Sequence, residues 1–174
     1  MGKYVITTPR LQLRPMAMSD LDALAAMYAD AETMQYIGYG EVIDRETTKL
    51  GLEKRVAEYQ SKGYGQFTLE LHDGTFIGRT GLMDWLIDGV PEREVGYILA
   101  RPHWGHGYAT EGARAVRDYA RDVHGLNRLI SLILPQNAGS IRVAEKNGMM
   151  LEKITTIPHT GRRVCCYARN WSET

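Results

Sequence analysis

Hydrophobic and polar residues alternate along several short stretches of the chain, and this period of two predicts β-strands. Residues 11–14 alternate in this way and end at Pro15. Residues 129–134 are almost wholly apolar, so this strand is expected to be buried on both faces. The remaining predicted strands, with turns at residues 72–75, 89–91 and 159–161, are residues 66–71, 75–85, 92–99, 151–157 and 164–168.

Apolar residues recur at helical spacing in four other stretches, each bounded by capping residues. Ser19 is predicted to cap the first helix, with the Asp22 carboxylate three residues further on. The others are a helix from Asp44 to Lys62 ended by Gly63, one through residues 116–123 that ends near Gly125, and one capped by Asn137 and ended by residues 147–148. This order of strands and helices predicts one three-layer α/β domain over residues 1–174.

Length and charge narrow the classes of protein that fit. The chain has 174 residues, which is enough for one domain with a substantial core. Its 21 basic and 21 acidic residues give a net charge of zero, which argues against a nucleic-acid or polybasic membrane partner. No apolar run approaches the ~20 residues that span a bilayer, and the first residues lack a secretory leader. We therefore expect a cytoplasmic protein.

The cysteines and histidines show no spacing typical of a metal site, so no metal is expected. Cys165 and Cys166 are adjacent in a predicted strand, where neighbouring side chains point to opposite faces. They are therefore expected to be free thiols rather than a disulfide.

A glycine-rich segment, residues 104–111, lies between a predicted strand and a predicted helix. Glycine lets the main chain approach a ligand closely, and the helix start presents free N–H groups, so the segment suits a phosphate. A tight turn that needs glycine only for its geometry is an equal alternative. The segment lacks the Gly-Lys-Ser/Thr of a Walker loop, and the next strand is not followed by the acid of a dinucleotide-binding fold.

Four stretches together resemble the GNAT superfamily of N-acetyltransferases, and within it the RimJ/RimL-type branch. They are residues 8–14 (TPRLQLR), 94–99 (EVGYIL), 104–111 (WGHGYATE) and 137–148 (NAGSIRVAEKNG), in this order over nearly the whole chain. The resemblance implies a three-layer domain whose mixed central sheet is mostly antiparallel and flanked by helices. It also implies acetyl-CoA as co-substrate.

The resemblance also implies which residues bind the cofactor. The pyrophosphate is expected on the main-chain N–H groups of the glycine-rich segment, and the pantetheine arm is expected beside the preceding strand. Asn137 and Ser140 are expected near the sulfur, although a helix cap and a first-turn hydroxyl explain them equally well. The implied residues are Ile98, Leu99, Ala100, Trp104, Gly105, His106, Gly107, Tyr108, Ala109, Thr110, Asn137 and Ser140.

Acetyl transfer to an amine requires removal of a proton from the nitrogen and can use an acid for the leaving thiolate. Glu94 is the first candidate for the base, and Asp84 and Glu111 are lesser candidates; a solvent-facing acid paired with Arg93 is the alternative for Glu94. Many GNAT enzymes place a tyrosine seven residues after the capping asparagine, where this chain has Ala144. Ser140 is the substitute that the RimL-type branch suggests, and a mechanism without an acid stays open.

The predicted function is transfer of acetyl from acetyl-CoA to a primary amine, by direct attack in a ternary complex. The acceptor is a protein N-terminus or a small molecule, and a monomer and a homodimer are both open. A non-catalytic acyl-CoA sensor or scaffold is the alternative. Acceptor choice is expected in the N-terminal third and the last hairpin, where pocket lining and core packing both explain Tyr28, Tyr36, Tyr39 and Trp85.

Charge is distributed unevenly along the neutral chain. Residues 18–48 hold seven acids and one base, whereas residues 101–128 hold five arginines, three acids and three histidines. This pattern predicts an electropositive cofactor side and an electronegative acceptor side, although surface solubility explains the acids equally well.

Overall fold

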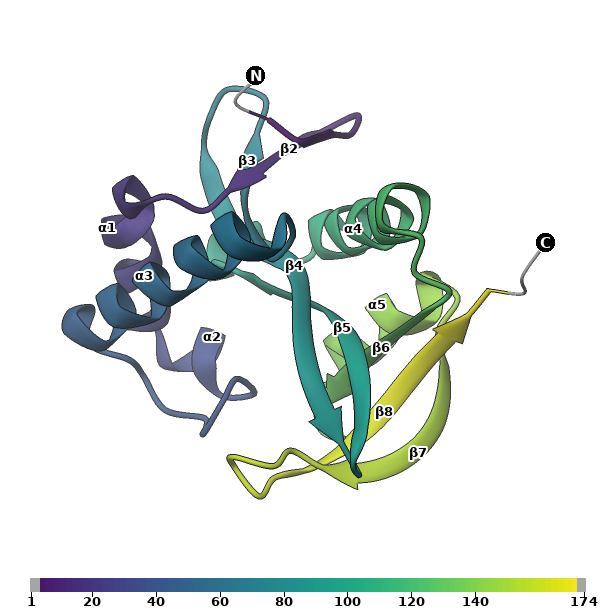
Figure 1. Cartoon of the computed structure of the whole chain (residues 1–174). Coiled ribbons are helices and arrows are strands. Elements are labelled where there is room, and N and C mark those ends of the chain that lie inside the picture. The colour runs from purple at the N-terminus through teal and green to yellow at the C-terminus, as the bar shows by residue number, and fades with distance from the viewer. Residues whose placement is uncertain (1–3, 172–174) are drawn as a thin grey trace.

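The computed structural model describes residues 4–171, which form one eight-stranded sheet around which the helices are arranged (Figure 1). The strand order is β1-β2-β3-β4-β5-β6-β8-β7, and only the β5–β6 neighbours are parallel. The mixed, mostly antiparallel sheet is therefore confirmed. The strands are β1 (Ile6–Thr7), β2 (Leu11–Pro15), β3 (Gln66–Leu71), β4 (Phe76–Ile87), β5 (Val90–Leu99), β6 (Arg128–Ile133), β7 (Met150–Thr156) and β8 (Arg163–Asn170).

Helices cover both faces of the sheet (Figure 1), and the two larger hydrophobic cores lie between the sheet and the helices, with a smaller one around Ile87, Ile130, Cys166 and Ala168. Ile98 and Leu99 follow each other on β5 and point to opposite faces, so Ile98 packs in the core beneath α1–α3 and Leu99 in the core beneath α4 and α5. The α-helices are α1 (Leu21–Tyr28), α2 (Ala31–Met34), α3 (Arg45–Lys62), α4 (Tyr108–His124) and α5 (Ala138–Lys146), and the short 3-10 helices are Met18–Asp20 and Arg101–His103.

The predicted helix boundaries hold where the capping contacts are local. Asp44 caps α3 by accepting a hydrogen bond from the Thr47 N–H at 2.7 Å, and Gly63 ends that helix with a left-handed φ of 74°. The prediction that Ser19 caps α1 is wrong. Asp20 instead accepts bonds from the Ala17 N–H at 2.9 Å and from Arg14 at 2.6 Å, because a buried ion pair outweighs a surface cap.

The β4–β5 turn also differs from the prediction. Asp88 and Gly89 occupy it with φ values of 51° and 78°, as a two-residue hairpin turn requires. Strand β5 therefore begins at Val90, and Pro91 lies in the strand opposite Leu86 rather than in the turn. The short strand β1 and the helix α2 are further elements that the sequence pattern did not predict.

Strands β5 and β6 diverge, and this divergence creates the site. Their register has one pair, Glu94 opposite Ile130, after which β6 continues beside β8. Side-chain bonds still cross the widening space: the Ser131 hydroxyl donates to the Val95 carbonyl at 2.7 Å, the Leu132 N–H to the Glu94 carboxylate at 2.9 Å, and the Tyr97 hydroxyl to the Ser140 carbonyl of α5 at 3.2 Å. The second half of β5 therefore presents one main-chain edge that no strand covers.

Three further features concern the expected membrane, metal and thiol chemistry. Across residues 4–171, no helix has both the length and the apolar character needed to span a membrane. The same part of the chain contains no group of three side chains suited to a metal ion. Cys165 and Cys166 are both buried and free.

Candidate acetyl-transfer site

A cavity of about 550 Å³ lies where β5 separates from α5 and faces the start of α4. Ten of the residues predicted to bind acetyl-CoA line it: Ile98, Leu99, Trp104, Gly105, Gly107, Tyr108, Ala109, Thr110, Asn137 and Ser140. Ala100, His106 and Glu94 are outside the lining. The structure thus brings together most of the residues that the sequence selected, from four separate elements.

The glycine-rich segment forms a tight turn, and it also lies where its main-chain N–H groups can face a ligand. Gly105 and Gly107 have left-handed φ values of 79° and 81°, so the turn itself needs glycine. A Cβ on Gly105 would meet open space, and one on Gly107 would lie 3.5 Å from the Arg10 guanidinium. Because the first turn of α4 also lines the cavity, its main-chain N–H groups and the positive end of its dipole lie beside the space for a ligand.

Arg10 holds this loop from the N-terminal part of the chain. Its guanidinium donates to the His106 carbonyl at 2.8 Å and to the Glu111 carboxylate at 2.6 Å, and it lies 4.8 Å from the centroid of the Tyr108 ring. Thr8 donates to the same carboxylate at 2.6 Å. Burial acts to raise the pKa of Glu111, but the hydrogen bonds from Thr8 and Arg10 lower it overall. Glu111 is therefore an occupied structural acid, which disfavours it as the base.

The main chain of β5 fixes which groups face the cavity. The Ala100 N–H donates to the Ile77 carbonyl at 2.9 Å, so it points toward β4 and away from the edge along which the pantetheine arm is expected. Successive N–H groups of a strand point to opposite edges, so those of Tyr97 and Leu99 face the open edge. The Leu99 carbonyl accepts from the Trp104 indole at 2.8 Å, which ties the glycine-rich segment to the strand.

Helix α5 contributes one face to the cavity. The Asn137 side chain accepts from the Ser140 N–H at 3.1 Å, so it does cap the helix while also lining the cavity. Arg142 and Lys146 supply cations that the sequence analysis missed. The signal was available, because Gly139, Arg142, Val143 and Lys146 follow the i, i+3, i+4, i+7 spacing of one helix face.

Glu94 is buried, with 6% of its surface exposed, so the alternative of a solvent-facing acid is wrong. One carboxylate oxygen accepts from the Leu132 N–H at 2.9 Å and the other from the Trp85 indole at 2.6 Å. Burial raises the pKa of the Glu94 carboxyl to about 7, against these two hydrogen bonds, which act to lower it. Glu94 can therefore take up and release a proton near neutral pH, as a general base must.

Asp84, the other lesser candidate, is occupied by cations. It pairs with Arg93 and accepts from Lys62 at 2.9 Å and from the Tyr64 hydroxyl at 3.1 Å. Burial acts to raise its pKa, but Lys62 and Arg93 lower it overall, so Asp84 stays ionised and is poorly suited to accept a proton.

The sequence profile of the acetyltransferase (GNAT) domain matches residues 10–150. The chain belongs to the GNAT acetyltransferase family. It is 34% identical over 172 residues to the uncharacterized protein YkkB of Bacillus subtilis (strain 168), with 97% of this chain and 96% of that protein covered. An acetyltransferase structure from Agrobacterium tumefaciens str. C58 superposes with a TM-score of 0.81 at 30% identity, covering 98% of this chain and 96% of that one.

A second solved structure shows the fold alone. The ribosomal L7/L12 α-N-protein acetyltransferase RimL, in complex with coenzyme A, superposes with a TM-score of 0.80 at 19% identity, covering 97% of this chain and 98% of that one. The family membership makes this chain an acetyl-CoA-dependent acyltransferase. It does not settle the RimJ/RimL-type branch, because the relative at 34% identity is named only as uncharacterized and the RimL structure is similar at 19% identity.

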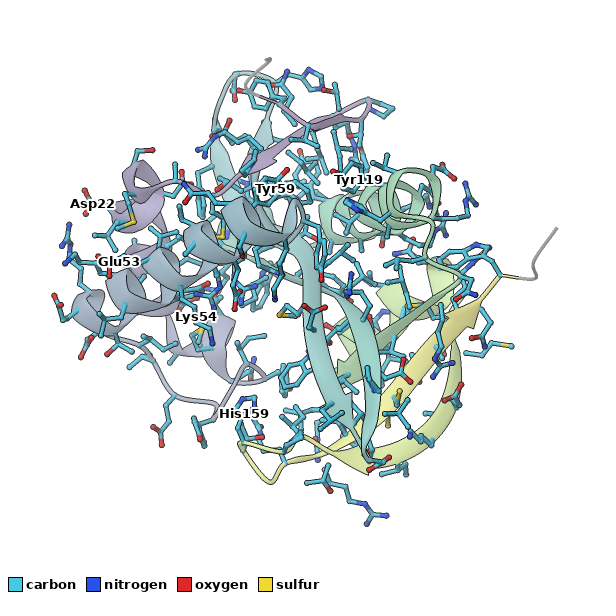
Figure 2. All side chains as sticks on the ribbon, viewed as in Figure 1. Asp22, Glu53, Lys54, Tyr59, Tyr119 and His159 are labelled. Carbon is cyan, nitrogen blue, oxygen red and sulfur yellow. The ribbon has the colours of Figure 1, made fainter. Side chains whose placement is uncertain are left out.

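Of the aromatic residues that were candidates for the acceptor pocket of this GNAT protein, one packs in the core and the others lie in or near the site. Tyr28 is buried, and its hydroxyl accepts from Arg79 at 2.5 Å, so it belongs to the core. Tyr36 lines the cavity. The Trp85 indole stacks on His159 with ring centroids 5.3 Å apart, and the Tyr39 hydroxyl donates to the His159 carbonyl at 2.9 Å. Figure 2 shows His159 between the tip of the β7–β8 hairpin and the segment that follows α2.

The predicted division into an electropositive and an electronegative side rests on charged groups that the structure largely pairs or places outside the cavity lining. The acids of residues 18–48 are largely occupied: Asp20 pairs with Arg14, Asp22 with Arg45, and Asp30 and Glu32 with Arg101, while Asp44 caps α3. The five arginines of residues 101–128 lie outside the cavity lining, whose cations are Arg142 and Lys146 on α5. Asp20, Asp30 and Glu32 pair with arginines outside residues 18–48, and the sequence does not reveal these pairings.

Proposed function

We propose that this acetyltransferase moves the acetyl group of acetyl-CoA to a primary amine of a peptide or small molecule while both substrates are bound. The observation that carries the proposal is the cavity itself. It has a glycine cradle and a helix start at one end, and it is lined by Tyr97 to Leu99 of β5, which begin three residues after the buried Glu94 on the same strand.

The residues of the cavity fit the chemistry of coenzyme A. Main-chain N–H groups from Gly105 to Thr110 would bind the pyrophosphate, and Arg142 and Lys146 would add positive charge. Trp104 holds the loop against Leu99. His106 acts in this scheme by its carbonyl, which Arg10 fixes, so it supports the loop rather than contacting the ligand. The pantetheine arm would lie along the open edge of β5, beside Ile98.

Acetyl-CoA supplies a thioester, and the amine nitrogen must be neutral to attack its carbonyl carbon. As the C–N bond forms and the C–S bond breaks, the nitrogen loses a proton, for which Glu94 is the proposed acceptor. Glu94 lies outside the cavity lining, so a bound water would carry the proton to it. A main-chain N–H on the open edge of β5, beside Ile98, would stabilise the negative charge on the carbonyl oxygen.

The thiolate of coenzyme A leaves readily, and Ser140 is the proposed donor of a proton to it. Ser140 lines the cavity at the start of α5, whereas Ala144, at the position of the tyrosine in other members, is buried in the core with 2% exposed. Ser140→Ala with a retained rate at neutral pH would show that the thiolate leaves without an acid.

A free-thiol assay tests the proposal. The full chain is incubated with acetyl-CoA and a panel of amino acids, amino sugars, small amines and peptides with free N-termini, and released coenzyme A is measured. We expect release that depends on the amine, with the acetylated amine identified by mass spectrometry. Tight binding of acetyl-CoA by calorimetry with no acetylated amine would instead favour the non-catalytic sensor. Acetylation of N-terminal peptides in preference to small amines would support the RimJ/RimL-type branch.

A further inference from the structure

A second cavity of about 610 Å³ adjoins the first, and its lining is basic and aromatic rather than acidic. It is lined by Tyr36, Leu134, Pro135, Gln136, Ile154, Arg162 and Arg163. We propose that it binds a carboxylate or phosphate group of the acceptor, so that the acceptor is an amine that carries an anion. This inference rests on the proposed function and names the substrate class of the same site.

The position of the second cavity suits an acceptor. It shares Tyr36 with the cofactor cavity, so the two spaces meet at that side chain. Residues 134–136 line it directly before Asn137, which lines the cofactor cavity. A molecule that reaches from one cavity to the other therefore passes the start of α5, where the thioester is proposed to lie.

The charge of the second cavity selects for an anion. Its lining includes two arginines and no acid, and Gln136 and Tyr36 add polar groups. The planar fork of a guanidinium matches the oxygen geometry of a carboxylate or phosphate. Within residues 4–171, no ion pair joins Arg162 or Arg163 to an acid, whereas Arg14, Arg45, Arg101 and Arg128 all have carboxylate partners.

Arg162 is already held in place at the edge of this cavity. One of its terminal nitrogens donates to the Gly38 carbonyl at 2.8 Å, and a Cβ on Gly40 would lie 3.5 Å from that same nitrogen. A neutral carbonyl leaves the positive charge of Arg162 uncancelled. Arg163 is exposed at the start of β8, opposite Thr156. One arginine is therefore preorganised and its neighbour is free to close on a ligand.

The test compares matched amines that differ only in an anionic group, in the same free-thiol assay. The pairs are L-methionine with L-methioninamide for a carboxylate, and O-phosphoethanolamine with ethanolamine and glucosamine 6-phosphate with glucosamine for a phosphate. We expect the anionic member of at least one pair to have a kcat/KM about ten-fold or more above its neutral partner, as for a charged hydrogen bond. The arm that shows the preference identifies the anion.

The variant Arg163→Gln is expected to remove most of that preference by raising the acceptor KM, with the KM for acetyl-CoA unchanged. Arg121→Gln, an exposed arginine paired with Asp122 on α4, is the control and should match the wild type. The double variant with Arg162→Gln should abolish the preference, and thermal unfolding of each variant reports whether the hairpin is intact.

Two results would overturn the inference while the proposed function stands. One is equal or better turnover of the neutral amine in every pair that reacts, and the other is an anion preference that survives both arginine substitutions. Failure of every amine, despite measured acetyl-CoA binding, overturns the proposed function and this inference together.

Discussion

The cofactor side and the acceptor side of the site are held together in different ways. On the cofactor side, the loop of residues 104–107 is fixed by Arg10 and Trp104, and the groups offered to a ligand are mainly main-chain N–H groups. On the acceptor side, three separate segments meet through few contacts: Tyr39 and Trp85 touch His159, and Arg162 touches Gly38.

This difference separates what is common to an acetyl donor from what selects an acceptor. A cradle made of backbone depends on the path of the chain, so many side chains can change without altering it. A pocket made of side chains from the segment after α2 and from the β7–β8 hairpin can change with a few substitutions, leaving the sheet intact. The acceptor side is therefore where members of one fold can diverge in substrate.

The largest expected effect comes from Glu94 on β5, the proposed general base. Glu94→Gln is expected to lower kcat by about 10²-fold or more at pH 7, the usual contribution of a general base, while the affinity for acetyl-CoA stays near that of the wild type. Because burial raises the pKa of Glu94 to about 7 and only the ionised form accepts a proton, wild-type kcat/KM should rise with pH through that value. Unchanged turnover in the variant would remove Glu94 from the mechanism.

The same carboxylate makes a prediction about stability. Its pKa is raised from 4.5 to about 7 in the folded chain, so between these values the folded state holds a proton that the unfolded state has lost. The free energy of unfolding should therefore fall as the pH rises across this window, by up to about 3 kcal/mol, and level off above it. Urea unfolding at pH 5 and pH 8 should show this fall in the wild type and a smaller one in Glu94→Gln. Equal falls would mean that Glu94 has an ordinary pKa.

Gly107→Val tests the backbone cradle. Gly107 has a φ of 81°, where a β-branched residue is strained by roughly 1–2 kcal/mol, so the loop should shift and coenzyme A should bind about ten-fold more weakly. The matched control is Gly125→Val, which places the same strain at the other end of α4, where φ is 63°. A comparable loss of stability in both variants, with weaker binding only in Gly107→Val, would support the cradle; normal binding would contradict it.

Arg10→Ala tests whether the cradle depends on its support from the N-terminal strand region. Loss of the bonds to the His106 carbonyl and to Glu111 should loosen the loop and raise the Kd for coenzyme A by about three- to ten-fold. The acceptor KM should not change. Arg45→Ala, which breaks an exposed pair with Asp22, is the control. A change in acceptor KM as large as that in Kd would mean that the two sides are not separate.

The smallest effect is expected on the acceptor side, from His159→Ala. Loss of the stack on Trp85 should loosen the hairpin and raise the acceptor KM by about two- to five-fold, with coenzyme A affinity unchanged. Tyr39→Phe keeps the ring and removes only the bond to the His159 carbonyl, so it should have a smaller effect in the same direction. Weaker binding of coenzyme A in either variant would mean that the acceptor side and the cofactor side are not independent.

The parts of the fold that the sequence predicts are those set by local pattern. Alternation located most strands, and Asp44 and Gly63 marked the ends of α3 because each cap involves residues within one helical turn. The prediction that Ser19 caps α1 failed because the contacts at this helix start are not local. The neighbouring Asp20 is drawn to Arg14 and to Thr68, a partner 48 residues away, and no local pattern reveals such a contact.

In the candidate site too, the sequence predicts the residues that lie within one motif and does not predict contacts between distant segments. The residues of the glycine-rich segment and the start of α5 follow one another in sequence, so a motif selects them. Arg10 and Glu111 are 101 residues apart, and Tyr39 and His159 are 120 apart, so only the folded chain brings them together. Likewise, the two donors that bond the Glu94 carboxylate, the Leu132 N–H and the Trp85 indole, lie on β6 and β4, which the sequence of its own strand does not reveal.

The indole contacts of Trp85 and Trp104 have an optical consequence. Trp104 donates to the Leu99 carbonyl beside the cofactor cavity, and Trp85 donates to Glu94 and stacks on His159. Indole emission responds to nearby charge and to neighbouring rings, so each side of the site carries its own built-in fluorophore. The third tryptophan, Trp171, lies after β8, so replacing it together with one of these two by phenylalanine would leave a single tryptophan whose emission reports occupancy of one side, without any attached label.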